Sequence, residues 1–162
     1  MPIRIPENNK ENEKICKMVK NKDYDIVWID KGHTILPSTL KYIKKISPNT
    51  IIVSYSPDNM ALRHNQTQQY LETIPLYDYF FTNKSYILDN MRKLGAKNIF
   101  FVNNSYEETF HHPYNLTEQE RIELGGDVGF VGSWEQERCD SILYLADNGI
   151  KVRVFGTKEW QK

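Results

Sequence analysis

Six short apolar runs alternate along the chain with longer segments whose apolar residues are spaced for helices. The runs are rich in β-branched and aromatic residues, and they occupy residues 26–29, 50–55, 79–82, 99–102, 128–131 and 152–155. Runs of this length and composition predict strands buried on both faces, as the strands of parallel sheets are. The alternation predicts right-handed β-α-β crossovers. The sequence therefore predicts an α/β fold with a Rossmann-like parallel sheet and flanking helices.

Helical spacing is clearest in the segments after the first and third runs. One apolar stripe spans residues 36–46, where Pro37 can occupy the first helical turn. A second stripe spans residues 87–94, with Ser85 as the predicted N-cap and Gly95 as the stop. Further helices are predicted around residues 15–19, 61–73 and 139–146, the last of them ended by Gly149.

The stretch from residue 103 to 127 has no strand character. It contains a capping box, Thr117 with Glu120, that predicts a short helix. A break of this length inside one doubly wound domain is unusual, so we interpret it as a linker between two sheets. The predicted organisation is a partial N-terminal Rossmann-like domain over 1–110, a linker over 111–126, and the start of a second Rossmann-like domain over 127–162.

The amino-acid composition limits the kinds of partner that the protein is expected to bind. The 21 basic and 21 acidic residues cancel, which gives no electrostatic basis for wrapping nucleic acid or coating an acidic membrane. No window approaches the roughly 20 apolar residues of a membrane span, and the amino terminus lacks the apolar core of a secretory signal. Cys16 and Cys139 form no ligand pattern and are expected to be reduced thiols. These features predict a cytoplasmic protein.

Polar residues follow the predicted strands, at the edge where open α/β sheets bind ligands. They favour a hydroxyl-rich or phosphorylated ligand, although solvated loops are polar in any case. A histidine placed directly after a strand, as His33 is, can act as a general base or can pack as a structural residue. The candidates at this edge are Lys31, Gly32, His33, Asp58, Asn59, Asn83 and Asn104.

The turn after the fifth run is the most specific local feature. Gly132 and Ser133 precede a helix predicted to open with Glu135, and free backbone N–H groups at such a helix can hold a diphosphate. Arg138 could add a charge-assisted contact. Glu135 would repel an anion unless it points away, and ordinary capping by Ser133 explains the same pattern. Both interpretations stay open on these residues alone.

The sequence lacks the common motifs for binding a dinucleotide cofactor, a nucleotide phosphate or a metal ion. No G-x-G-x-x-G or P-loop pattern follows a strand. The single D-x-D, Asp23-Tyr24-Asp25, lies at the amino end of a strand and away from the predicted cleft, where turn chemistry explains it. We therefore expect no bound metal and no cofactor.

Several segments resemble one family. The run from Asn103 to Gly156 resembles the interdomain region of GT-B glycosyltransferases: NNSYEETFHHP is similar to the segment that leaves the N-terminal domain. DVGFVGSWEQER followed by LADNGIKVRVFG is similar to the opening β-α-β of the nucleotide-sugar-binding domain. Upstream, DIVWIDKG and IIVSYSPDN resemble N-domain strands of the CgeB-like branch, related to spore-maturation proteins. The D-N pair Asp58-Asn59 matches an acidic pair common in that branch.

The resemblance covers residues 24–160 and implies metal-independent transfer of a sugar from a nucleotide-sugar donor to an unknown glycan, protein or small-molecule acceptor. By position, it implies that Gly132, Ser133 and Arg138 bind the donor. Catalytic candidates are His33 and Asp58, and the acceptor-side cleft would be lined by Lys31, Gly32, Asn59, Asn83 and Asn104.

Similar proteins carry at least one more βαβ unit before the first run and continue well past Trp160. The sequence is therefore expected to be a fragment, incomplete at both ends. Two alternatives remain: a truncated, non-catalytic GT-B-like binding module, and a flavodoxin-like single domain, which leaves the long linker unexplained.

Overall fold

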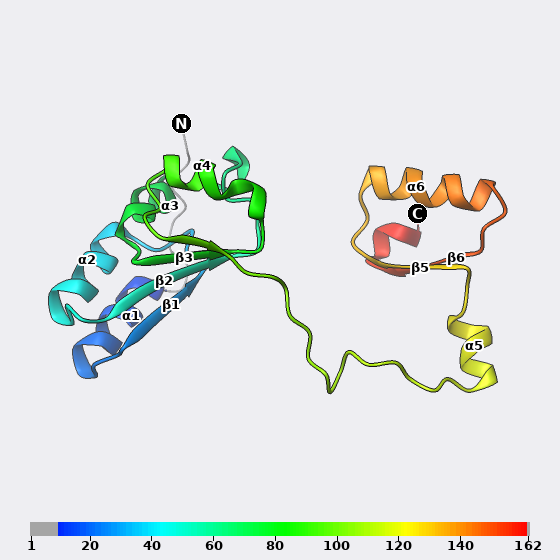
Figure 1. The fold of residues 1–162 in the computed structure, drawn as a ribbon, viewed down its shortest axis with the longest axis horizontal. Helices are drawn as coiled ribbons and strands as arrows, with labels where there is room; N and C mark the ends of the chain where they lie inside the picture. Colours follow the sequence, from blue (N-terminus) through cyan, green and yellow to red (C-terminus); the bar gives the residue numbers. More distant parts are fainter. Residues whose placement is uncertain (1–9, 162) are drawn as a thin grey trace. The chain divides into compact units, whose positions relative to one another are not determined.

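The six apolar runs form six β-strands at the predicted places. The structure, a computed structural model, describes residues 10–161 (Figure 1). The strands are β1 (Ile26–Asp30), β2 (Ile51–Ser56), β3 (Tyr79–Thr82), β4 (Ile99–Phe101), β5 (Val128–Gly132) and β6 (Val152–Gly156). They form one parallel sheet of four strands and one of two. The predicted α/β fold with a Rossmann-like parallel sheet is confirmed.

Helices connect the strands. The α-helices are α1 (Glu11–Asn21), α2 (Pro37–Ile46), α3 (Gln68–Thr73), α4 (Leu88–Lys93), α5 (Glu118–Leu124) and α6 (Gln136–Asp147). Short 3-10 helices are η1 (Arg63–Asn65), η2 (Ile74–Leu76), η3 (Ser85–Ile87) and η4 (Lys158–Gln161). The segment predicted as one helix over 61–73 is thus divided between η1 and α3.

Two helix starts differ from the prediction. Ser85 is not an N-cap: it is the first residue of η3, and no side chain caps η3 or α4. α6 begins at Gln136, one residue later than predicted, and no side chain, that of Ser133 included, caps it. Both predicted stop glycines do end helices. Gly95 and Gly149 have φ of 107° and 80°, in the left-handed region that favours glycine.

The chain divides into two units, the first ending at Ser105 and the second beginning at Tyr106. No strand or α-helix lies between β4 and α5. The predicted capping box starts α5. The Glu120 N–H donates to Thr117 Oγ1 at 3.3 Å, and the Thr117 N–H donates to Glu120 Oε2 at 2.8 Å.

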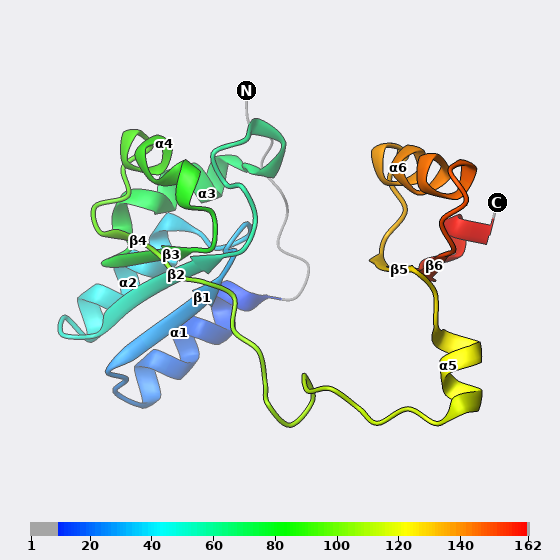
Figure 2. The ribbon, with the colours of Figure 1, turned by 45° about the vertical axis from the view of Figure 1, so that its right-hand side comes forward.

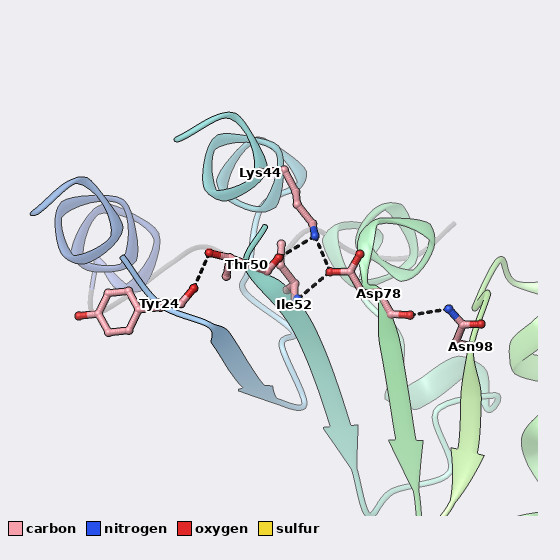
Figure 3. Close-up of polar contacts among 6 residues, drawn as sticks. All are labelled: Tyr24, Lys44, Thr50, Ile52, Asp78 and Asn98. Atoms are coloured by element: carbon pink, nitrogen blue, oxygen red, sulfur yellow. Dashed lines mark hydrogen bonds and ion pairs between the residues drawn. The ribbon is translucent and has the colours of Figure 1, made fainter. Parts of the chain in front are cut away.

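The first sheet has its strands in chain order, β1-β2-β3-β4. The β-α-β crossovers between parallel strands are right-handed. When each new strand is added on the same side of the previous one, all the connecting helices therefore lie on the same face of the sheet. Figure 1 and Figure 3 show the helices of this unit gathered on one side of the sheet. The core lies between that face and the helices, and its largest apolar side chains are Leu40, Ile43, Ile52, Met60, Tyr70, Ile74, Phe80, Ile87 and Met91.

The other side of the sheet, which we call the open face, is covered by no helix of the first unit within residues 10–105 (Figure 1). The prediction that these strands are buried on both faces is therefore wrong: Trp28 is 55% exposed and Phe100 is 47% exposed. Aromatic and β-branched composition predicts strands but does not reveal their order, and it is the order that leaves one face uncovered. The open face consists of Ile26, Trp28, Ile51, Val53, Tyr55, Tyr79, Phe81 and Phe100.

A polar network joins the amino ends of the four strands (Figure 3). Lys44 Nζ lies 2.6 Å from Asp78 Oδ2 and donates to the Thr50 carbonyl at 2.7 Å. The same Asp78 carboxylate accepts the Ile52 N–H at 2.7 Å. Bonds from Thr50 Oγ1 to the carbonyl of Tyr24 and from Asn98 to the carbonyl of Asp78 extend the network to β1 and β4. This edge of the sheet is structural, so ligands are to be sought at the opposite edge.

The second unit is a single β-α-β motif preceded by α5. Figure 2 shows α6 lying along one side of β5 and β6. Trp160, in η4, donates from Nε1 to the Gly132 carbonyl at 2.9 Å and so ties η4 to the end of β5. No residue between Tyr106 and Gln161 is buried. A two-stranded sheet with so little core has marginal stability by itself.

Candidate functional site

The turn after β1 holds two successive residues in the left-handed region. Lys31 has φ of 58° and Gly32 has φ of 71°. A Cβ at position 32 would lie 2.8 Å from the Tyr77 hydroxyl and 3.1 Å from Ile29 Cγ2, so the turn accommodates only glycine there. The tight turn directs Lys31 toward the next loop, where its Nζ lies 2.6 Å from Asp58 Oδ2.

The Lys31–Asp58 pair joins the loops after β1 and β2. Both side chains remain about half exposed, at 49% and 40%, so the pair is open to a ligand. An exposed ion pair of this kind contributes only about 0–1 kcal/mol to stability. The Asp58 N–H donates to Ser56 Oγ at 3.2 Å, and Asn59 Oδ1 accepts the Ala61 N–H at 3.2 Å. The side-chain oxygen of Asn59 is therefore committed to its own loop.

A second pair joins the loops after β3 and β4. Asn83 Nδ2 donates to Asn104 Oδ1 at 2.7 Å. Asn83 Oδ1 is buried and, within residues 10–161, lacks a hydrogen-bond partner. The structure thus brings the predicted cleft residues together as two pairs along one edge, Lys31 with Asp58 and Asn83 with Asn104.

The structure does not place the His33 ring where it could act as an accessible general base. Its carbonyl accepts a hydrogen bond from Thr67 Oγ1 at 2.8 Å, which ties the β1 loop to the start of α3. Its ring meets the Tyr70 ring edge-on, with centroids 5.7 Å apart. Its Nε2 is buried and has no partner among the described residues. In this conformation a substrate cannot reach Nε2, which favours the structural interpretation of His33.

Buried hydroxyl groups behind the Gly32 turn were not found by sequence reasoning. The Tyr70, Tyr77 and Ser54 hydroxyls are buried without a well-formed hydrogen bond in the described part of the chain. Burial raises the pKa of Tyr77 to about 12, although the nearby hydroxyls of Thr73 and Ser54 partly offset this effect. Burial also raises the pKa of Tyr70, and the proximity of Tyr77 adds to the increase. A tyrosine next to apolar core residues gives no sequence signal for such a cluster.

The raised pKa of Tyr77 predicts a loss of stability in alkali. Its ordinary pKa is 10.0, so the unfolded chain ionises first; this contribution is complete below pH 10 and is lost as the pH rises through about 12. Between pH 9 and 12 we expect the wild type to lose about 2 kcal/mol more unfolding free energy than Tyr77→Phe. Urea denaturation at each pH measures this difference. The control Tyr86→Phe, at a 69% exposed position, should behave as the wild type; parallel losses in all three proteins would contradict the assignment.

A hollow at this edge lies on the open face. It has a volume of 650 Å³, and the Trp28 and Phe81 rings in it are nearly parallel, at 8° with centroids 6.0 Å apart. Trp28 Nε1 donates to Asp30 Oδ1 at 2.8 Å, which fixes the indole. The sequence predicted Asn104 here but not Trp28, Tyr55 and Phe81, which come from three different strands and meet only through the register of the sheet. The lining residues are Trp28, Tyr55, Phe81, Val102, Asn103, Asn104 and Ser105.

In the second unit the predicted donor-binding residues lie together at the end of β5. Arg138 Nη1 donates to the Ser133 carbonyl at 3.0 Å and to Ser133 Oγ at 3.1 Å. Arg138 Nη2 lies 3.1 Å from Glu135 Oε1. Gly132 is the last residue of β5. The guanidinium is thus held beside the turn, partly neutralised by Glu135, and it keeps further N–H groups for a ligand.

Two features are absent from the described residues. Within residues 10–161 no three His, Cys, Asp or Glu side chains gather into a group that could hold a metal ion. Over the same residues, no helix has the length and apolar character needed to cross a bilayer.

Comparison with known proteins assigns no family. No protein-family model matches the chain, and no curated protein matches it.

Proposed function

We propose that the chain is part of a GT-B glycosyltransferase that moves a sugar from a nucleotide-sugar donor to an acceptor. The observation that carries the proposal is the pair of parallel α/β units joined by a strand-free segment, with polar side chains at the carboxyl ends of the strands in both. This is the organisation that the sequence resemblance implies. In it the first unit meets the acceptor and the second meets the donor.

The donor side is suited to a leaving diphosphate. α6 has 12 residues, and the free N–H groups of its first turn carry partial positive charge near the end of β5. Arg138 is held there by Ser133, so it needs little reorganisation to donate to a phosphate oxygen. Fixed donors of this kind stabilise charge that develops on the leaving group. Glu135 limits the effect unless it turns toward sugar hydroxyls.

On the acceptor side Asp58 is the better candidate base. Its carboxylate is 40% exposed at the edge, whereas the Nε2 atom of His33 is buried. A general base must come within hydrogen-bond reach of the acceptor hydroxyl. Lys31, paired with Asp58, would orient that carboxylate, and the Asn83–Asn104 amides would bind further hydroxyl groups.

Replacing Ser133 by aspartate should weaken donor binding about tenfold, because it adds a negative charge next to the proposed diphosphate position. Calorimetric titration with UDP-glucose, UDP-N-acetylglucosamine and GDP-mannose measures the affinity. Ser141→Asp is the matched control, since Ser141 is exposed on α6 and its Oγ bonds only to the Glu137 carbonyl among the described contacts. Equal affinity in the wild type and Ser133→Asp removes this turn from the site. Failure of all three sugars to bind the wild type contradicts the donor role.

The alternative, a binding module without catalysis, is favoured by one observation: the guanidinium of Arg138 is already paired with Glu135. The two functions differ in what happens to a bound donor. An enzyme should release the nucleoside diphosphate in the presence of an acceptor or, slowly, of water. A chain that binds the donor and releases no diphosphate is a binding module.

A further inference from the structure

Asn148 is the only asparagine of the chain that is followed by a glycine. Asn148 and Gly149 are both exposed, in the turn between α6 and β6 (Figure 2). Asparagine is one of the thermolabile residues of proteins, because the backbone nitrogen that follows it can attack its side-chain amide. Glycine has no Cβ to hinder that attack. The turn therefore holds the two groups that such a reaction needs.

The turn is a Schellman motif, in which Asn148 is the C-cap of α6. The Gly149 N–H donates to the Ala146 carbonyl at 3.0 Å, and the Ile150 N–H donates to the Leu145 carbonyl at 3.1 Å. Gly149 has the left-handed backbone that this motif requires, with φ of 80°. Both bonds close short loops that contain Asn148, so the integrity of the motif depends on the backbone of this residue.

Hydrogen bonds occupy both reacting groups while the turn is closed. The Gly149 N–H is bonded within the Schellman motif, and Asn148 Nδ2 donates to the Tyr144 carbonyl at 2.8 Å. The last turn of α6 must therefore open before the two groups can react. Opening costs little in this unit, because no residue in 106–161 is buried. A Cβ at position 149 would meet no atom within 4 Å, so the space around the glycine is free.

We propose that Asn148 deamidates through a cyclic imide, and that opening of the last turn of α6 controls the rate. The Gly149 nitrogen forms a bond to Asn148 Cγ, and the bond from Cγ to Nδ2 breaks. Nδ2 leaves as ammonia and carries away the proton that the Gly149 nitrogen gives up. Water then opens the ring at either carbonyl, with its hydroxyl going to the carbon and its remaining proton to the nitrogen. Opening at the side-chain carbonyl gives aspartate, and opening at the backbone carbonyl gives isoaspartate.

Either product weakens the turn. A carboxylate at position 148 cannot donate to the Tyr144 carbonyl, and it adds negative charge at the negative end of the α6 dipole. Isoaspartate also lengthens the backbone by one methylene inside the loops of the Schellman motif. The next residue but one, Lys151, donates its N–H to Asp127 Oδ2 at 2.9 Å, beside the start of β5. Deamidation therefore loosens the β-α-β motif where its two strands meet, and it is independent of the proposed function.

Incubation of the full chain at mildly alkaline pH tests the proposal, with isoaspartate located by peptide mass spectrometry and enzymatic methylation. Asn104 is the internal control, because it is exposed and is followed by the small residue Ser105. We expect isoaspartate to form severalfold faster at Asn148 than at Asn104. Equal rates at the two asparagines, or aspartate without isoaspartate at position 148, would overturn the proposal.

Gly149→Ala tests the attack by the backbone nitrogen. Alanine weakens the left-handed turn, so the turn opens more often, but its methyl group hinders the attack. We expect the yield of isoaspartate at Asn148 to fall severalfold although the turn is weaker. A yield equal to that of the wild type, or higher, would show that Gly149 has no special part in the reaction.

Control of the rate by turn opening has its own measurement. The rate at Asn148 in the urea-unfolded chain, divided by the rate in the folded chain, should equal the hydrogen-exchange protection of the Ile150 amide. Equal rates in the folded and unfolded chains would contradict this control.

Asn148→Asp, which makes one of the two products directly, tests the consequence for stability. It should raise the ratio of unfolded to folded second unit about tenfold, the effect of one lost hydrogen bond together with the unfavourable charge. Hydrogen exchange of the β5 and β6 amides measures this ratio. Asn115→Asp is the matched control, since Asn115 is exposed before α5, and it should leave the ratio unchanged. Equal ratios in the two variants would show that the product does not weaken the turn.

Discussion

Replacing Asp78 by alanine should lower the unfolding free energy of the first unit by about 3 kcal/mol. The largest part comes from the Ile52 N–H, which donates to this carboxylate at 2.7 Å and lies in a fully buried residue. Without an acceptor, a buried N–H costs about 1–3 kcal/mol. The ion pair with Lys44 adds less, because both side chains are about one-third exposed and solvent screens them.

The stability of this unit can be measured separately from that of the second by hydrogen exchange of the slowest amides in β2 and β3, together with urea denaturation. Asp89→Ala is the matched control: its pair with Arg92 lies on the surface of α4, and its loss should change stability by less than about 0.5 kcal/mol. Asp78→Asn keeps an oxygen acceptor and should recover part of the loss. Similar values for Asp78→Ala and Asp89→Ala would show that the amino-edge network does not hold the strands together.

Gly32→Ala should also destabilise the first unit by about 3 kcal/mol. Alanine in the left-handed region costs about 1 kcal/mol. The remainder comes from the new Cβ, which would lie 2.8 Å from the Tyr77 hydroxyl and 3.1 Å from Ile29 in a packed layer. Thermal unfolding of the wild type and the variant measures the change.

Gly149→Ala, measured on the second unit to which Gly149 belongs, gives the backbone contribution alone. Its φ is 80°, close to the 71° of Gly32, but a Cβ there meets no atom within 4 Å. We therefore expect a cost of about 1 kcal/mol, from the backbone alone. If the two alanine variants lose equal stability, the close approach of Tyr77 to the turn is not a constraint.

The strands and most helices could be predicted from the sequence because their information is local. The run at 79–82 becomes β3, and the box of Thr117 with Glu120 starts α5. The order of the strands is not local information. That order leaves Trp28 exposed on the open face, so the expectation of strands buried on both faces failed.

The location of the site could be predicted from the sequence, but the contacts between its residues could not. Lys31 and Asp58 follow different strands, and their contact depends on the left-handed turn that the sequence signals only through Gly32. Whether a histidine after a strand turns outward or inward depends on its neighbours in space. For His33 that neighbour is Tyr70, which comes from a helix far along the chain.

The chain order of the first sheet has a consequence for how the protein is made. Each strand pairs with the one synthesised next, so every contact closes a short loop and costs little chain entropy. β1 and β2 can pair on the ribosome as soon as the helix between them has emerged, and each later βα segment adds to a template that already exists. Sheet growth of this kind is vectorial, because each of the four described strands extends the sheet on the same side as the one before it.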